Sequence, residues 1–185
     1  MRFRLIACAL LLCSACSTAT NSPAPSRHAS PSPTSSTFSS ARFTATIPRG
    51  WRDATGDPEA VASVGAAGQV LMLLTATSTS FNEHIDVSVA AQPVADDQLA
   101  GYLQSVAQSG ATNLSAAQPF SLEDGTGIFI TYNLTSTGGT LLKDQDMVIN
   151  HNGDTFDIVL NTAAADFDAQ VAALQGILES WKWTS

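Results

Sequence analysis

Cysteine is scarce in this sequence of 185 residues, and its three copies all fall within the first sixteen positions. Nothing downstream of Cys16 can therefore form a disulfide framework, a zinc cluster or a cysteine nucleophile. Basic residues are also scarce, with eight Lys and Arg against sixteen Asp and Glu and a formal net charge of -8. Because nucleic-acid binding depends on clustered Lys and Arg, we expect no nucleic-acid partner.

The motifs of common hydrolases and nucleotide-binding proteins are missing as well. The sequence has no G-x-S-x-G elbow for a nucleophilic serine, and only two histidines, His84 and His151, follow residue 41. The glycine-rich stretch 65–68 lacks the lysine and the following helix of a phosphate-binding loop. We therefore expect a protein that is not an enzyme and that holds no cofactor.

Residues 1–15 have the features of a secretion signal. Two arginines are followed by the apolar run 5–12, which is shorter than the about 20 residues needed to span a membrane. Next comes Cys13-Ser14-Ala15-Cys16. It resembles the bacterial lipobox, in which small residues precede a cysteine that is lipidated and becomes the mature N-terminus. The usual Leu, Val or Ile is replaced here by Cys13.

The resemblance to a lipobox implies lipid attachment at Cys16 and an extracytoplasmic location, with the protein anchored to the outer face of the cell membrane. The alternative is an ordinary secretory signal cleaved after Ala15, which would release a soluble exported protein. Residues 16–41 supply the expected tether, because they are almost entirely Ser, Thr, Pro and Ala and cannot build a core. A flexible coil of this length spans roughly 25–30 Å.

Residues 42–185 form one expected globular domain, and its charge differs from that of the whole chain. Three of the eight basic residues precede residue 42, whereas all sixteen acidic residues follow it, so the domain has a formal charge of -11. Alternating apolar residues predict strands, and apolar residues at helical spacing predict helices. The predicted strands are 42–47, 69–77, 84–90, 126–135, 141–150 and 155–161, with 112–119 as a further candidate. The predicted helices are 96–109 and 166–181.

This order of elements predicts an α+β fold. Asn152-Gly153 is a strong hairpin signal, because both residues accept the positive φ of a type I′ turn, so the strands on either side belong to an antiparallel meander. Asp166 is placed to cap the last helix. The antiparallel sheet would then be covered by helices.

Five polar residues gather around the Asn152-Gly153 turn and could bind a divalent metal: Asp144, Asp146, His151, Asp154 and Asp157. Their spacing matches no calcium loop, and Asp144 and Asp146 share one face of a strand. We therefore interpret them as a solvent-exposed acidic face rather than a metal site. Trp51 is interpreted mainly as a core residue at the end of the first strand, and Trp51 and Trp183 are the candidate ligand or partner contacts.

The combination of a lipobox, a Ser/Thr/Pro tether, the sequence Ile47-Pro48-Arg49-Gly50-Trp51, a β-meander and a C-terminal helix resembles the actinobacterial LpqN-type lipoproteins of the PsbP/Mog-like fold. The resemblance implies an α/β/α sandwich with a central antiparallel sheet. It also implies a non-enzymatic envelope protein that binds a hydrophobic, lipid-like ligand or a protein partner. A structural module of an envelope complex and a divalent-metal-binding protein remain the alternatives.

Overall fold

The computed structural model describes residues 35–66, 68–77, 83–107, 110–123 and 125–184. The expected signal peptide and the expected lipid-attachment residue, Cys16, lie outside these described residues. Within them, no helix combines the length and the apolar character that crossing a membrane requires.

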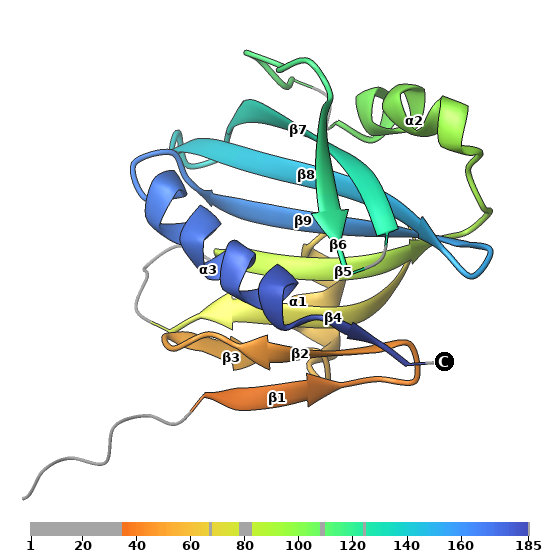
Figure 1. Cartoon of the computed structure of the whole chain (residues 1–185). Coiled ribbons are helices and arrows are strands. Elements are labelled where there is room, and N and C mark those ends of the chain that lie inside the picture. The colour runs from red at the N-terminus through yellow and green to blue at the C-terminus, as the bar shows by residue number, and fades with distance from the viewer. Residues whose placement is uncertain (1–34, 67, 78–82, 108–109, 124, 185) are drawn as a thin grey trace, which may run out of the picture. The chain divides into compact units, whose positions relative to one another are not determined.

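Seven strands form one antiparallel sheet in the order β3-β4-β5-β9-β8-β7-β6 (Figure 1). Asn152 and Gly153 connect β8 and β9 with φ values of 50° and 83°, as the predicted hairpin turn requires. The meander predicted from the sequence is therefore confirmed. The strand bounds are β3 Trp51–Asp53, β4 Gly68–Ala76, β5 His84–Ala90, β6 Gln118–Leu122, β7 Gly125–Thr135, β8 Leu141–His151 and β9 Asp154–Ala163.

A second, three-stranded sheet has the order β1-β2-β10, with β1 at Ser36–Ser39, β2 at Phe43–Ile47 and β10 at Lys182–Trp183. Strand β1 lies within the segment whose composition indicates a tether. Phe38, the only aromatic residue between 16 and 41, is 6% exposed and packs 5.5 Å from the ring of Phe43. Within the described residues, regular structure is therefore already present at Ser36, before residue 42.

Helices cover both faces of the large sheet. Helix α3, Phe167–Ser180, packs on one face. Helices α1, Pro58–Ser63, and α2, Leu99–Val106, lie on the other face. The short 3-10 helix η1, Asp96–Gln98, precedes α2. This arrangement confirms the α+β class and the central antiparallel sheet between helices. Asp166 precedes α3, but its side chain makes no capping hydrogen bond, so that detail of the prediction is wrong.

Helix α1 was not predicted from the sequence. The residue that marks the start of this helix in the sequence is Asp57. Its side chain accepts hydrogen bonds from the backbone N–H groups of Glu59 and Ala60. Six residues are too few to show an apolar period, so only the capping residue and the proline that follows it mark the helix. The helix matters because its C-terminal end lies over the sheet beside strand β5.

The face of the large sheet that packs against α3 is apolar. It is called the α3 face below, and it forms one core with α3 and the small sheet. Trp181 stacks on Phe43 with ring centroids 3.8 Å apart and thereby joins the end of α3 to strand β2. From the large sheet, this core includes Trp51, Met72, Leu74, Ile85, Val87, Leu122, Met147, Ile149, Phe156, Ile158 and Leu160.

Candidate functional site

The opposite face of the same sheet carries buried carboxyl groups. Asp86, Asp144, Asp146 and Asp157 are 2%, 0%, 2% and 4% exposed. Asp144 and Asp146 do share a face, as predicted, but the interpretation of that face as solvent-exposed is wrong. The C-terminal end of α1 and helix α2 lie over this part of the sheet and bury its side chains, which the strand pattern alone does not reveal.

The register of the sheet explains why these side chains converge. Asp86 on β5 and Asp146 on β8 both pair with Val159 on β9, from its two sides. Asp157 lies two residues before Val159 on the same strand and therefore points to the same face. Three neighbouring strands thus each place one carboxyl group around Val159.

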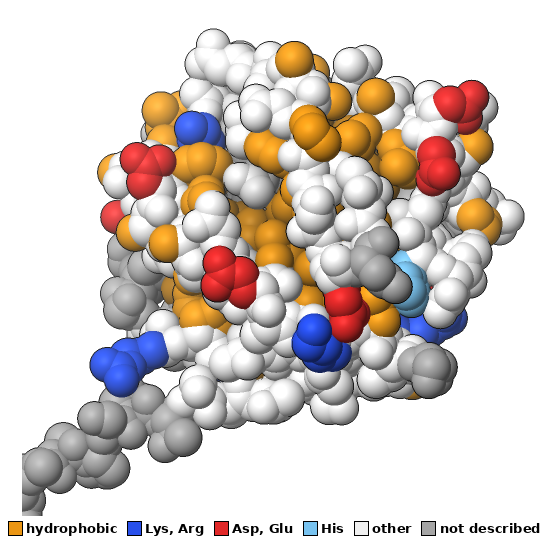
Figure 2. Space-filling model, in the orientation of Figure 1, with side chains coloured by type: hydrophobic (Ala, Val, Ile, Leu, Met, Phe, Trp, Pro, Cys, Tyr) orange, Lys and Arg blue, Asp and Glu red, His pale blue; other side chains and the backbone are white. Residues whose placement is uncertain are grey.

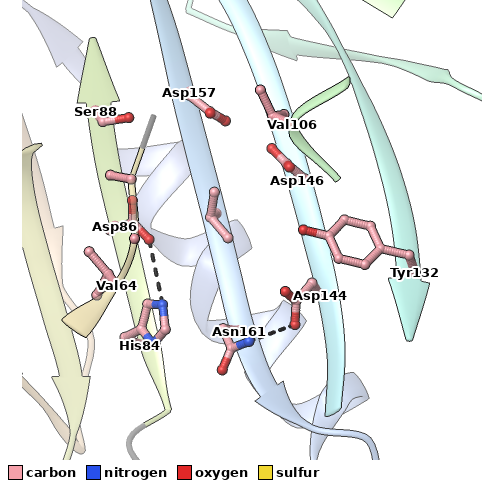
Figure 3. A pocket seen from close by; sticks show the side chains of 13 residues that line it. Val64, His84, Asp86, Ser88, Val106, Tyr132, Asp144, Asp146, Asp157 and Asn161 are labelled. Atoms are coloured by element: carbon pink, nitrogen blue, oxygen red, sulfur yellow. Dashed lines mark hydrogen bonds and ion pairs between the residues drawn. The ribbon is translucent and has the colours of Figure 1, made fainter. Parts of the chain in front are cut away.

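These carboxyl groups line a cavity of about 60 Å³, which we call the acidic pocket. Figure 3 shows their side chains projecting from β5, β9 and β8 into a common space, with Tyr132 reaching in from β7. Val64, at the end of α1, and Val106, on α2, complete the lining. The lining residues are Val64, Gly65, Ala66, His84, Asp86, Ser88, Val106, Tyr132, Asp144, Asp146, Asp157, Val159 and Asn161.

Asp146 and Asp157 behave as a pair. Asp157 lies diagonally across from Asp146 on the neighbouring strand, and a hydrogen bond between the two side chains requires that one of the carboxyl groups hold a proton. Burial raises the pKa of both, and the charge of Asp157 raises that of Asp146 further. One oxygen of each residue, the Oδ1 atom, is buried and has no hydrogen-bond partner.

Asp144 has a side-chain donor for one oxygen, whereas its Oδ2 atom is buried without a hydrogen-bond partner, like the Oδ1 atoms of Asp146 and Asp157. The side-chain amide of Asn161 donates a hydrogen bond of 2.8 Å to its Oδ1 atom. Burial raises the pKa of Asp144 to about 7, while the hydrogen bonds from Asn161 and the Tyr132 hydroxyl act in the opposite direction. This carboxyl group therefore changes its charge near neutral pH.

Asp86 lies on the β5 side of the pocket. Its Oδ1 atom is 3.6 Å from Nε2 of His84, which belongs to the same strand and lines the same cavity. Burial raises the pKa of Asp86 well above its usual value, and the charges of Asp157 and Asp144 raise it further. The pocket thus holds several carboxyl groups whose negative charge is destabilised by their surroundings.

The structure separates the residues that the sequence grouped around the hairpin turn. Asp144, Asp146 and Asp157 enter the pocket, whereas Asp154 pairs with Arg42, and His151 stacks on Trp183 with ring centroids 4.0 Å apart. Residues of the two sets alternate along β8 and β9, so they point to opposite faces of the sheet. Within the described part of the chain, no three His, Cys, Asp or Glu side chains are arranged to hold one metal ion.

Two pocket residues that the sequence analysis did not single out are Asp86 and Tyr132. The available signal for Asp86 is its position between Ile85 and Val87 in a predicted strand, where its face is shared with His84 and Ser88. A charged residue at such a position is unusual unless its face is solvated or functional. Tyr132 carries no signal of its own, because aromatic residues are common in strands.

The candidate tryptophans lie away from the acidic pocket. Trp51 begins β3, is 8% exposed and belongs to the core of the α3 face. Trp183 is half-buried in β10, between His151 and the rings of Phe156 and Trp181.

The space between α3 and the sheet is filled by core side chains such as Leu174 and Ile177. A more open groove of about 500 Å³ lies beside α3, and hydrophobic side chains are visible in the hollow of this face in Figure 2. Its lining is mostly polar and comprises Ser121, Glu123, Gln175, Leu178, Glu179, Trp181 and Lys182.

The fold is similar to two solved structures, although neither a known family model nor a curated protein matches the sequence. One is the solution structure of the cyanobacterial PsbP protein CyanoP from Synechocystis, with a TM-score of 0.54, 15% identity, and 80% of this chain and 92% of that chain covered. The other is the crystal structure of LpqN, a protein involved in cell envelope biogenesis of Mycobacterium tuberculosis, with a TM-score of 0.54 and 16% identity. That match covers 85% of this chain and 88% of LpqN. The chain therefore has the PsbP-like fold of the LpqN type that its sequence predicts.

Proposed function

We propose that this chain is a lipid-anchored, extracytoplasmic, non-enzymatic binding protein, and that the acidic pocket is its ligand site. The observation that carries the proposal is the pair of buried Oδ1 atoms of Asp146 and Asp157, which lack hydrogen-bond partners. A buried acceptor without a partner costs about 1–3 kcal/mol, and more when it is charged. A positively charged ligand would supply the missing partner and the missing counter-charge.

The arrangement of polar groups in the pocket supports binding rather than catalysis. Ser88 and His84 lie on either side of Asp86 along β5, four residues apart, which is about 13 Å in a strand. A serine nucleophile needs its histidine base within hydrogen-bond reach, with the carboxylate behind the histidine. The order found here places the carboxylate between them, so His84 cannot activate Ser88.

The envelope location rests on two supports. The first is the resemblance of residues 13–16 to a lipobox, and the second is the likeness in fold to LpqN, a protein of cell envelope biogenesis. Replacing Cys16 by Ser in the native host tests the anchor, because the variant should leave the membrane fraction and the detergent phase. A variant that remains membrane-bound would show that Cys16 is not the anchor.

The alternative of a hydrophobic ligand makes a different demand on the structure. Pockets for drug-sized ligands usually enclose about 300–1,000 Å³ and are mainly apolar. The acidic pocket is far smaller, at about 60 Å³, and the larger groove beside α3 is lined mostly by polar residues. A small, positively charged ligand therefore fits these two sites better than an acyl chain does.

A thermal-shift comparison of the full mature chain distinguishes the two ligand classes. The probes are small monovalent organic cations on one side and octanoate on the other. We expect the cations to raise the melting temperature of the wild type but not of Asp157→Asn, since ligand binding stabilises only the state that binds. Stabilisation by octanoate alone, retained in Asp157→Asn, would overturn the acidic-pocket assignment in favour of the groove.

A further inference from the structure

We propose that the ligand of the acidic pocket is a single primary alkylammonium group, and that it takes the place of the proton held between Asp146 and Asp157. This inference rests on the proposed function, because it names the chemical class that the pocket would bind. Three features carry it: the arrangement of the carboxyl groups, the size of the cavity and the apolar residues at its rim.

The carboxyl groups lie on one face of three neighbouring strands, a placement that suits hydrogen bonds to a nitrogen better than metal coordination. Asp86, Asp146 and Asp157 come from three neighbouring strands and surround Val159. An –NH₃⁺ group has three donors and no acceptor, and it reaches carboxylate oxygens at about 2.7–2.9 Å. Metal ions require shorter bonds and closer convergence, and no group of three candidate ligands in the described residues meets that requirement.

The cavity volume limits the ligand further. One water molecule needs roughly 10–15 Å³ of such space, so a cavity of about 60 Å³ holds only a few water-sized groups. An ammonium group with its first methylenes fits within that space. A guanidinium group is planar and presents five donors in a fixed fork, which suits a bidentate carboxylate better than three carboxyl groups around a point.

Apolar side chains accompany the acidic ones. Val64, at the end of α1, and Val106, on α2, are half-buried and line the same cavity as the carboxyl groups. They provide contact for the methylenes of an alkylammonium ion while the charged head lies deeper. No Lys or Arg occurs among the residues that line this cavity, so the described part of the chain supplies no internal ammonium group.

Binding of the ammonium ion releases one proton from the pocket. In the empty pocket, the pair Asp146 and Asp157 shares one proton and one negative charge. When the ammonium ion enters, both carboxyl groups become charged, and the proton leaves to water. Because a proton and the ligand compete for the same pair, the affinity should rise with pH.

Every titratable group around the pair bears on this pH dependence. Asp86 and His84 face it from β5, Asp144 from β8 and Tyr132 from β7. Tyr102 on α2 also interacts with Asp146 and Asp157, and burial together with those charges raises its pKa to about 12. The tyrosines therefore stay neutral below pH 9, whereas the carboxyl groups titrate and determine the slope.

Isothermal titration calorimetry of the full mature chain with n-butylamine tests the proposal, with n-butyltrimethylammonium as the matched probe that has the same charge but no N–H donor. Titrations at each pH from 5.5 to 7.5, in two buffers that are effective at that pH and differ in ionisation enthalpy, count the released protons. We expect n-butylamine to bind at least about tenfold more tightly than its trimethylated counterpart. Its affinity should rise up to about tenfold per pH unit, as release of one proton requires.

Two variants sharpen the result. Asp157→Asn should weaken n-butylamine binding at least about tenfold and remove the proton release, since the pair no longer exists. Asp154→Asn is the matched control, because it lies on the same strand but pairs with Arg42 outside the pocket, and it should bind like the wild type. The two wild-type probes need no variant, so the test does not depend on the stability of Asp157→Asn.

Each remaining outcome has a definite meaning. Equal affinity for the two butyl probes, or binding without proton release, would overturn the ammonium inference while leaving a cation-binding pocket in place. Tighter binding of calcium than of n-butylamine would overturn it in favour of a metal site. If none of the cations binds, the proposed function is overturned as well.

Two further probes identify the source of the ammonium group. N-acetyl-lysine amide represents a lysine side chain, and phosphoethanolamine represents a lipid headgroup.

Discussion

Strand β9 contributes to two regions of opposite character. Ile158 points toward α3 and is fully buried among apolar side chains, whereas its neighbour Asp157 points into the acidic pocket and is 4% exposed. The two residues are equally buried but have opposite effects on folding, because burial of apolar surface is favourable and burial of a charge without a counter-charge is not. The comparison indicates that the α3 face provides the stability that the acidic face reduces.

The largest expected effect concerns the α3 face. Ile158→Ala should lower the free energy of unfolding by about 3 kcal/mol, since it removes buried methyl groups and leaves a cavity. Urea denaturation at pH 7 measures the change. A loss below about 1 kcal/mol would mean that this core is loosely packed and would remove the basis of the comparison.

The next effect is the pH dependence of stability. Asp144 has an ordinary pKa of 3.8 that burial raises to about 7 in the folded chain, and the pKa values of Asp86, Asp146 and Asp157 are raised too. The unfolded state therefore releases these protons at lower pH than the folded state. The stabilising contribution of these groups is fully present below about pH 4 and is lost as the pH rises toward 7.

We expect the free energy of unfolding to fall by about 2 kcal/mol or more between pH 4.5 and pH 7.5, since one pKa unit corresponds to about 1.4 kcal/mol. Urea denaturation at several pH values measures the slope. Asp144→Asn should make it shallower, whereas Asp53→Asn, at an exposed end of β3, should not. A free energy of unfolding that rises with pH over this range would contradict the assigned direction of the pKa shifts.

A smaller effect of opposite sign is expected from Asp157→Asn, the neighbour of Ile158. At pH 8 the substitution removes a buried negative charge and leaves an amide that can donate to Asp146. The free energy of unfolding should rise by about 1 kcal/mol at this pH, and the gain should vanish at pH 4.5, where the carboxyl group is protonated. A variant that is less stable than the wild type at both values would show that Asp157 supports the fold rather than a ligand.

Much of the sheet could be predicted from the sequence, because its strands alternate regularly and one turn has a specific chemistry. His84 to Ala90 coincides with β5, and Asn152-Gly153 forms the turn between β8 and β9. The pairing of β5 with β9 could not be predicted in the same way, since the two strands are separated by about sixty residues that carry no signal of their partner. Yet this pairing creates the pocket.

The burial of the acidic residues could not be predicted from the sequence, for a related physical reason. Period two places Asp144 and Asp146 on one face, but whether that face is wet depends on what covers it. The covering elements are α1, which has only six residues, and α2, whose apolar stripe includes Leu103. Neither pattern indicates which side of the sheet the helix will cover, so a solvated face was the reasonable expectation.

The smallest expected effect concerns Asp154, which the sequence placed in the same acidic group as Asp157. Its partner is Arg42, and the two side chains are 26% and 50% exposed, so water and salt screen their attraction. Asp154→Asn should therefore lower the free energy of unfolding by no more than about 0.5 kcal/mol, and 1 M NaCl should reduce even this difference. Urea denaturation at low and high salt measures both values.

A large effect of Asp154→Asn that persists in salt would mean that the pair anchors β2 to the large sheet. A negligible one, beside a large change in ligand binding for Asp157→Asn, would show that residues three apart on one strand have separate roles because they point to opposite faces.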